Sequence, residues 1–133
     1  MENTDCLFCR IVRDDSLGRI IEENSDGFLM EDGYPITMGH SLVIPKRHVE
    51  SFFDTTPEEK ASLFLLVERA KGILDKKYQP SAYNIGINDG SAAGQTVPHL
   101  HIHLIPRYEE TGSDPRGGVR WIIPEKADYW GDK

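Results

Sequence analysis

Hydrophobic positions along the 133-residue chain repeat with two different periods. Between residues 56 and 78 they recur at spacings of three and four, which predicts one long helix with a single apolar face. The residues on that face are Leu63, Leu66, Val67, Ala70, Ile73 and Leu74. We expect the helix to begin at Thr56-Pro57-Glu58-Glu59, because a hydroxyl cap, a first-turn proline and two carboxylates suit a helix N-terminus. A shorter helix is predicted from Cys6 to about Asp15, with Leu7, Ile11 and Val12 on one face.

Five short runs of apolar or β-branched residues predict strands. They cover residues 19–24, 28–32, 41–45, 82–88 and 99–105. Asn24-Ser25-Asp26-Gly27 supplies a turn between the first two, and prolines at 45 and 106 close two others because proline cannot donate a ladder hydrogen bond. Strands with one crossing helix, and no regular alternation of the two, are typical of an α+β fold with a mostly antiparallel sheet. The length suits one domain, residues 1–133.

The composition is that of an ordinary globular protein, with 38% hydrophobic and 28% charged residues. The formal net charge of −7 argues against binding to a nucleic-acid polymer, which needs clustered Lys and Arg. The longest apolar run, Leu63 to Val67, is far shorter than the roughly 20 residues of a membrane span. The first ten residues lack the basic start and apolar run of a secretory signal, so we expect a cytoplasmic protein without a membrane partner.

Three of the five histidines stand at alternate positions in the last predicted strand: His99, His101 and His103. In an extended strand they share one face and lie roughly 6.6 Å apart along it. A solvent-exposed polar face would also explain this alternation. The preceding loop, residues 89–97, is rich in glycine, and its backbone N–H groups together with Gln95 and Thr96 could bind an anion. Because a neutral imidazole is a nucleophile near pH 7, loop and strand together predict phosphoryl or nucleotidyl transfer chemistry.

The run HLHIHLI, residues 99–105, resembles the signature of the histidine triad family of nucleotide hydrolases and transferases. The segments DGYPITMGHSLVIPKRHV, NDGSAAGQTV and IPR also resemble that family, so the likeness covers about residues 5–108 and leaves a tail at 109–133. The resemblance implies an enzyme of nucleoside phosphates. It also implies one long and one short helix on a five-stranded sheet, and a homodimer whose two sheets join into a ten-stranded one.

The resemblance also implies roles for individual residues. His101 would attack the α-phosphorus and form a nucleotidyl-histidine intermediate, and a backbone carbonyl bound to its other ring nitrogen would fix the reactive tautomer. His103 would contact the same phosphate, and His40 matches a further active-site histidine. Asp32 would bind the ribose hydroxyls. Asn88, Gln95 and Thr96 would contact the phosphates and the leaving group.

Cys6 and Cys9 are the chain's two cysteines, in a C-x-x-C spacing that suggests metal binding or redox chemistry in a cytosolic protein. Two ligands do not complete a tetrahedral site. In zinc-containing members of the family, the resemblance adds His48 and His99, which gives a closed structural Cys2His2 zinc and no organic cofactor. The alternative is a pair of reduced structural thiols, with His48 on a surface turn.

The leading interpretation is a hydrolase of dinucleoside polyphosphates, such as diadenosine tetraphosphate, that releases a nucleoside monophosphate. His103 favours hydrolysis, since the sugar-phosphate transferase branch of the family has glutamine there. Two alternatives are a hydrolase of adenosine phosphoramidates and a non-catalytic nucleotide-binding sensor. A catalytic zinc on all three strand histidines is disfavoured, because ideal geometry separates the outer pair by roughly 13 Å. Trp121 and Trp130 could pack at a dimer interface or cap the nucleotide pocket.

Overall fold

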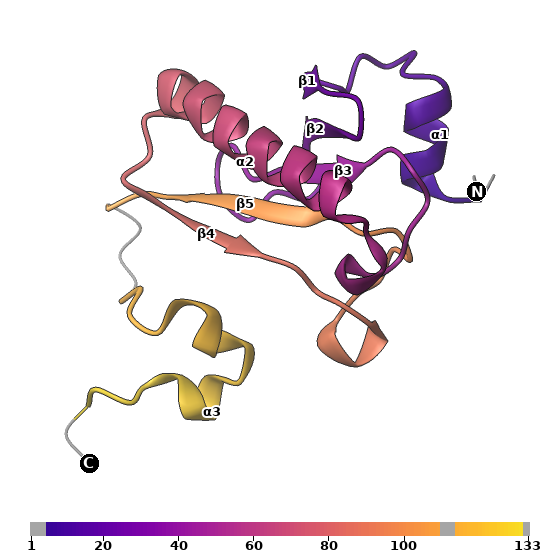
Figure 1. Ribbon diagram of the computed structural model, residues 1–133. Helices are drawn as coiled ribbons and strands as arrows, with labels where there is room; N and C mark the ends of the chain where they lie inside the picture. Colours follow the sequence, from indigo (N-terminus) through magenta and orange to yellow (C-terminus); the bar gives the residue numbers. More distant parts are fainter. Residues whose placement is uncertain (1–4, 110–113, 132–133) are drawn as a thin grey trace.

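Five strands form one antiparallel sheet, in the order β1-β2-β3-β5-β4, in the part of the chain that the structure describes (Figure 1). The structure is a computed structural model that describes residues 5–109 and 114–131. The strands are β1 Glu22–Glu23, β2 Gly27–Glu31, β3 Ser41–Pro45, β4 Ala82–Gly86 and β5 Ile102–Arg107. The predicted α+β fold with a mostly antiparallel five-stranded sheet is confirmed.

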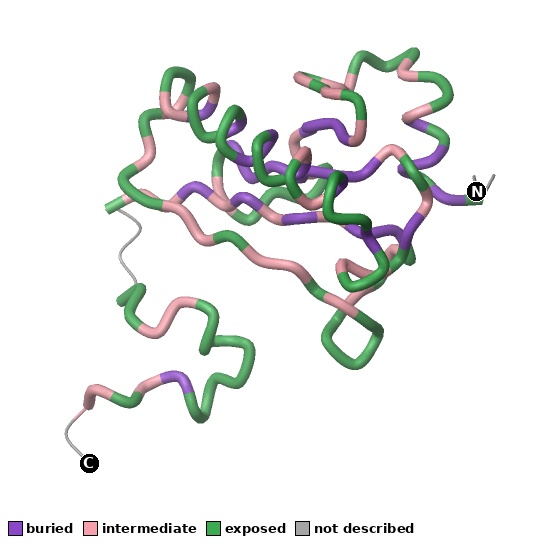
Figure 2. Tube along the Cα trace, viewed as in Figure 1, coloured by how far each residue is buried: buried purple, intermediate pink, exposed green. Residues whose placement is uncertain are grey.

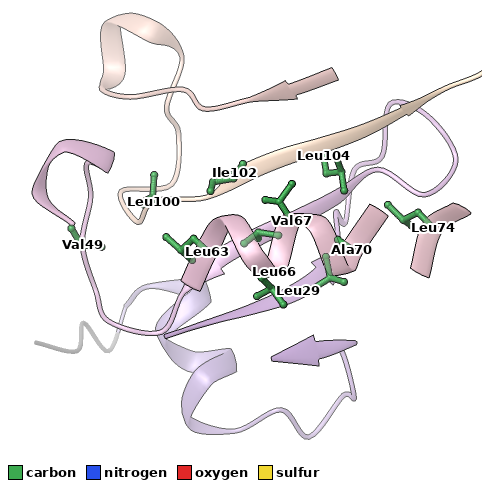
Figure 3. Close-up of a cluster of buried hydrophobic side chains, with 11 residues drawn as sticks. Leu29, Val49, Leu63, Leu66, Val67, Ala70, Leu74, Leu100, Ile102 and Leu104 are labelled. Carbon is green, nitrogen blue, oxygen red and sulfur yellow. The ribbon is translucent and has the colours of Figure 1, made fainter. Parts of the chain in front are cut away.

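Helix α2, Pro57–Tyr78, covers one face of the sheet (Figure 1). It begins with the predicted cap, because the Thr56 hydroxyl accepts from the Glu59 N–H while the Glu59 carboxylate accepts from the Thr56 N–H. Its apolar face packs on β2, β3 and β5 to form the larger core, shown in Figure 3. That core contains Leu29, Val43, Val49, Leu63, Leu66, Val67, Ala70, Leu74, Leu100, Ile102 and Leu104.

The end of α2 fixes the loop between β2 and β3. Gly39 adopts a positive φ of 88°, and a Cβ at this position would lie 2.8 Å from the Tyr78 ring. The Tyr78 hydroxyl donates to the Glu31 carboxylate at 3.0 Å. The last residue of the helix therefore holds the chain directly before His40.

Helix α1, Leu7–Arg13, belongs to a second core on the opposite face of the sheet. This core contains Cys6, Phe8, Cys9, Ile11, Phe28, Met30, Leu42 and Ile44. The predicted position of Leu7 was wrong: its side chain is 38% exposed, whereas Phe8 is 3% exposed. Phe8, Ile11 and Val12 stand at spacings of three and four and so share one helical face, whereas Leu7 and Val12 are five residues apart, about 140° around the helix.

The first predicted strand, residues 19–24, is reduced to Glu22–Glu23. The cause lies in Asp15, whose carboxylate accepts from the N–H groups of Arg19 and Ile20 at 2.6 and 3.0 Å. These side-chain hydrogen bonds replace ladder pairing at the start of the segment.

The histidine segment enters the sheet later than predicted, because β5 begins at Ile102 and not at His99. Leu100 donates its N–H to the Val49 carbonyl at 2.7 Å, outside the sheet ladder. The Pro45 carbonyl, at the end of β3, accepts from the His99 ring at 2.8 Å. Two of the three histidines therefore lie on a short connecting segment before the strand. At its other end β5 runs through Pro106, which pairs with Tyr83 of β4.

The C-terminal segment 114–131 contains a helical turn, Gly118–Ile122, and a third helix, α3 Pro124–Ala127, beyond the two that were predicted. Figure 2 shows that most of this segment is exposed. Its aromatic residues pack locally: the Arg116 guanidinium lies 4.8 Å from the Trp130 ring, and the Trp121 indole donates to the Arg116 carbonyl. Within the described ranges, no helix has the length and apolar character needed to cross a membrane.

Candidate functional site

The His101 ring is held in a single orientation. Its Nδ1 lies 2.8 Å from the His99 carbonyl oxygen, which can only accept a hydrogen bond. The proton therefore sits on Nδ1, and the lone pair on Nε2 is free. Phe8 packs edge-on at 5.3 Å between ring centroids, and His103 lies at 5.2 Å. The tautomer is the one expected from the sequence for a nucleophile.

His103 contacts His40, a buried histidine in the loop before β3. The His40 Nε2 lies 2.9 Å from the His103 Nδ1 and 3.4 Å from the Asp32 carboxylate. The Ile36 N–H donates to the His40 Nδ1 at 3.2 Å. Asp32, His40 and His103 therefore form one connected group, although they come from three different parts of the chain.

Burial lowers the pKa of both histidines in this group. The pKa of His103 falls to about 4, chiefly through desolvation and further through the neighbouring His101 and His40. Desolvation also lowers the pKa of His40, against the opposing effect of the Asp32 carboxylate. Both rings are neutral near pH 7. The His103 Nε2 is buried and has no hydrogen-bond partner among the described residues.

The Gln95 side chain makes three hydrogen bonds that hold the glycine-rich loop in its conformation. The Gln95 amide oxygen accepts from the Gly90 N–H at 2.8 Å, and its nitrogen donates to the carbonyls of Glu50 and Val97. The predicted role of Gln95 in phosphate contact therefore competes with a role in shaping the loop. Asn88 and Thr96 are exposed on the same loop.

Asp89 is a residue that the sequence interpretation missed. Its carboxylate accepts from the Ser51 hydroxyl at 3.0 Å and from the Phe52 N–H at 2.8 Å, which ties the loop to the turn Phe52–Asp54. An Asp before a glycine reads as part of a turn, and nothing local in the sequence identifies a partner 37 residues away.

Cys6, Cys9, His48 and His99 form a second group, and Phe8 packs edge-on against both His99 of this group and His101, with ring centroids 5.5 and 5.3 Å apart. The His99 Nδ1 lies 3.4 Å from the Cys6 Sγ, 3.6 Å from the Cys9 Sγ and 3.2 Å from the His48 Nδ1. The Cys9 Sγ to His48 Nδ1 distance is 3.2 Å. Ligand atoms around a tetrahedral zinc lie about 3.3 to 3.8 Å apart, given Zn–N and Zn–S bonds of about 2.0 and 2.3 Å. The four side chains fit such an ion.

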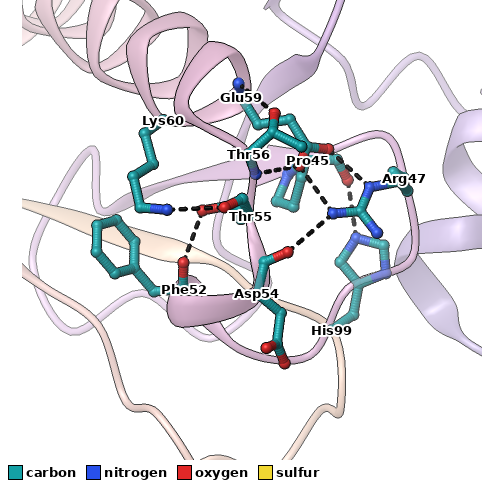
Figure 4. Close-up of polar contacts among 9 residues, drawn as sticks. All are labelled: Pro45, Arg47, Phe52, Asp54, Thr55, Thr56, Glu59, Lys60 and His99. Carbon is teal, nitrogen blue, oxygen red and sulfur yellow. Dashed lines mark hydrogen bonds and ion pairs between the residues drawn. The ribbon is translucent and has the colours of Figure 1, made fainter.

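Contacts around these four side chains orient the ligand atoms. The His99 ring donates from Nε2 to the Pro45 carbonyl, so its Nδ1 lone pair faces the two sulfurs and His48. Arg47, next to His48, makes two hydrogen bonds of 2.9 and 2.8 Å to the Glu59 carboxylate at the start of α2 (Figure 4). The cap of the long helix and the loop that carries His48 are therefore one network.

Replacing Glu59 with glutamine is expected to lower the free energy of unfolding by about 2 kcal/mol at pH 7. The hydrogen bonds from Arg47 lower the pKa of Glu59 from 4.5 to about 2. The Arg47 side chain is 45% exposed, so water screens part of the stabilisation that this shift provides. A depressed carboxyl pKa contributes stability above about pH 4.5, and that stability is lost as the pH falls toward 2. Urea unfolding between pH 7 and 3 should show the gap between wild type and variant closing.

Glu58→Gln is the matched control, because Glu58 is an exposed carboxylate in the same helical turn. It should change the stability by less than about 0.5 kcal/mol. A Glu59→Gln gap that keeps its full size down to pH 3 would contradict the assignment of the low pKa.

Both the sequence and the fold of the chain are similar to those of known proteins. A family model described as the HIT domain matches residues 15–110. The chain is 37% identical over 109 residues to an uncharacterized 16.1 kDa HIT-like protein of Mycoplasma pneumoniae, covering 82% of this chain and 76% of that one. It is 52% identical over 73 residues to the asymmetrical bis(5'-nucleosyl)-tetraphosphatase of Schizosaccharomyces pombe, covering 55% and 40%. The adenylylsulfatase HINT3 of Arabidopsis thaliana is 36% identical over 105 residues, covering 79% and 53%.

Solved structures have the same fold. A zinc-bound histidine triad family protein of Mycobacterium smegmatis superposes with a TM-score of 0.74 at 37% identity, over 83% of this chain and 80% of that one. A HIT family member of Bacillus subtilis has a TM-score of 0.74 at 34% identity, over 80% and 75%.

Proposed function

Because the chain belongs to the HIT domain family, whose members include nucleotide hydrolases, we propose that it hydrolyses dinucleoside polyphosphates, such as diadenosine tetraphosphate, at an α-phosphate. The observation that carries this proposal is the His101 tautomer, with Nδ1–H on the His99 carbonyl and a free Nε2 lone pair. A protein that only binds nucleotides needs no such nucleophile. The Schizosaccharomyces pombe relative, named as a tetraphosphatase, supports the substrate class.

The reaction proceeds in two displacements at one phosphorus. The His101 Nε2 lone pair attacks the α-phosphorus and forms a P–N bond, while the P–O bond to the rest of the polyphosphate breaks and the leaving group takes its electron pair. The His99 carbonyl stabilises the positive charge that develops on the ring. A water molecule then attacks the same phosphorus, the P–N electron pair returns to Nε2, and the proton from water passes to solvent.

The neighbouring residues bind the substrate. His103 lies beside His101 and presents a buried Nε2 without a partner among the described residues, which suits a contact to a phosphoryl oxygen. Asp32 lies at the edge of the same group and would accept hydrogen bonds from the ribose hydroxyls. Asn88 and Thr96, on the exposed loop, would contact the leaving phosphates.

Mass spectrometry combined with a substrate panel tests the proposal. Diadenosine tetraphosphate, an adenosine phosphoramidate and adenylyl sulfate should each be incubated with the protein and quenched in base, which preserves a phosphoramidate bond. The expected result is AMP release from the tetraphosphate and an adenylylated peptide that contains His101. Tight AMP binding without turnover and without an adduct would instead identify a nucleotide sensor.

We also propose that Cys6, Cys9, His48 and His99 hold a structural zinc ion. Their donor atoms all lie within 4.8 Å of one another, and the bound ion would fix α1 to the segment before β5. The zinc-bound Mycobacterium smegmatis protein supports this assignment. Two metal-bound thiolates suit a reducing compartment, in agreement with the cytoplasmic location expected from the sequence.

The proposed assembly is a homodimer formed across the edge of the sheet. β4 lies at that edge, and the exposed apolar side chains of Ile85 on β4 and of Phe64 and Leu65 on α2 lie on neighbouring elements. Pairing two β4 strands would join the sheets into ten strands and cover these side chains. Sedimentation equilibrium should give twice the mass of one chain, and a monomer at micromolar concentration would overturn the assignment.

A further inference from the structure

His99 takes part in both the proposed metal site and the proposed active site. Through Nδ1 its ring faces the other members of the metal group, which are Cys6, Cys9 and His48. Its backbone carbonyl oxygen accepts the hydrogen bond from the His101 Nδ1 at 2.8 Å. Ring and carbonyl are attached to the same Cα, so a displacement of the ring that turns the backbone also turns the acceptor that orients His101. A proposed zinc ligand and the proposed nucleophile are therefore directly connected.

The segment that carries His101 lies before the sheet ladder, because β5 begins one residue later. Two backbone carbonyls on either side of His48 hold this segment instead. The Pro45 carbonyl accepts from the His99 ring at 2.8 Å (Figure 4), and the Val49 carbonyl accepts from the next backbone N–H at 2.7 Å. The position of the carbonyl beside His101 therefore depends on the same loop that supplies a ligand to the metal group.

Phe8 is a second connection between the two sites. It stands between Cys6 and Cys9 in the sequence, at the start of α1, and is 3% exposed. The centroid of its ring lies 5.5 Å from that of His99 and 5.3 Å from that of His101, edge-on in both cases. Phe8 also belongs to the close-packed second core, so its ring cannot move away from the two imidazoles without opening a cavity.

We propose that Phe8 is a positioning residue for the nucleophile: it holds the His101 ring in place, and metal occupancy of the group around Cys6 and Cys9 holds Phe8 and His99. The inference rests on the proposed function and on the proposed zinc ion. Occupancy of the metal group then controls how fast the nucleotidyl-histidine forms, with little effect on the affinity for AMP. The reason is that a misplacement of about 1 Å between reacting atoms can cost about 100-fold in rate.

Replacing Phe8 with leucine tests this contact while the metal ligands stay in place. Leucine keeps an apolar side chain in the second core but lacks the ring that reaches both histidines. We expect the variant to retain one zinc ion per chain and the wild-type affinity for AMP. In single-turnover experiments with diadenosine tetraphosphate, it should form the His101 adduct about 10- to 100-fold more slowly. Ile11→Val is the matched control, because Ile11 lies in the same core about one turn further along α1, and it should behave as wild type.

Nitrogen-15 NMR of the histidine rings provides a readout independent of turnover. Near pH 8, His101 in zinc-loaded wild type should show a protonated Nδ1 and an unprotonated Nε2, the tautomer that the His99 carbonyl selects. A mixture of the two tautomers is expected for zinc-loaded Phe8→Leu and for wild type after removal of zinc by a chelator. If the zinc-free protein unfolds, Phe8→Leu decides the case, because it keeps the ion.

A zinc-loaded Phe8→Leu protein with the wild-type rate and a single His101 tautomer would overturn the inference and leave the proposed function intact. A loss of AMP affinity as large as the loss of rate would also overturn it, because Phe8 would then bind the nucleotide and not orient the nucleophile. Absence of the His101 adduct with every substrate would overturn the proposed function and the effect on rate, whereas the tautomers would still decide whether Phe8 orients His101. A wild-type protein without zinc by elemental analysis would overturn the metal assignment, and this inference with it.

Discussion

Replacing His101 with asparagine should reduce kcat for diadenosine tetraphosphate by about 10⁴-fold or more, with little change in the affinity for AMP. Asparagine has an amide donor that can reach the His99 carbonyl, but it has no nucleophilic lone pair to form a bond to phosphorus. The effect should therefore fall on kcat and on the covalent adduct. Single-turnover kinetics with calorimetric measurement of AMP binding would separate these quantities.

The asparagine variant should also remain folded, because His101 is only partly buried and Phe8 keeps its other contacts in the second core. A melting temperature close to that of wild type is the required control. His103→Asn is the comparison variant, since it removes a proposed phosphate contact and leaves the nucleophile, so the adduct should form slowly but still form. A His101→Asn protein with one tenth or more of wild-type turnover, or an adduct on another residue, would overturn the assignment.

Replacing Cys9 with serine should remove one zinc ion per chain and strongly destabilise the fold. Cys9 is fully buried, and its Sγ lies within 3.6 Å of both histidine nitrogens of the group. A hydroxyl is a poorer zinc ligand than a thiolate, and a roughly 1,000-fold loss of affinity lowers the free energy of unfolding by about 4 kcal/mol at saturating zinc. Elemental analysis and urea unfolding would measure the two effects.

A chelator supplies the matched test for the wild-type protein. Removal of the ion from wild type should lower its stability toward that of the Cys9→Ser variant, whereas the chelator should not affect the variant further. If the variant kept its zinc, the ion would be bound elsewhere, and the structural assignment would fail. Equal stability of wild type with and without the chelator would also contradict the assignment of a structural zinc.

The sequence predicted the parts of the fold that depend on local patterns. The period of Leu63, Leu66, Val67, Ala70 and Leu74, together with the Thr56 cap, placed α2 within one residue at each end. Such predictions succeed because propensity, capping and apolar periodicity agree in one segment.

Predictions that depended on distant partners were less accurate. The late start of β5 results from the Pro45 carbonyl and the Val49 carbonyl, which are far from the histidines in sequence. Neither Asp89 nor Gln95 has a local signal that reveals its partners across the loop. The error at Leu7 was of another kind, because Phe8, not Leu7, has the spacings of three and four to Ile11 and Val12 that place residues on one helical face.

For the candidate site, the sequence predicted which residues lie together, but not how they are hydrogen-bonded. The structure brings Cys6 and Cys9 to His48 and His99, and it brings Asp32 and His40 to His103. Which ring donates to which could not be predicted, because the tautomer of His40 is fixed by one backbone N–H of Ile36. That single hydrogen bond depends on the path of the loop.

Helix α2 contacts a segment of each of the two groups, one at each of its ends. Its first turn holds the His48 loop through Glu59 and Arg47, and its last residue, Tyr78, packs against Gly39 directly before His40. The 22 residues span about 33 Å, and one inserted or deleted residue would rotate the far end by about 100°. The helix could then keep its contact with Arg47 or its contact with Gly39, but not both. The number of residues in a helix that contributes no side chain to the candidate site therefore helps to position that site.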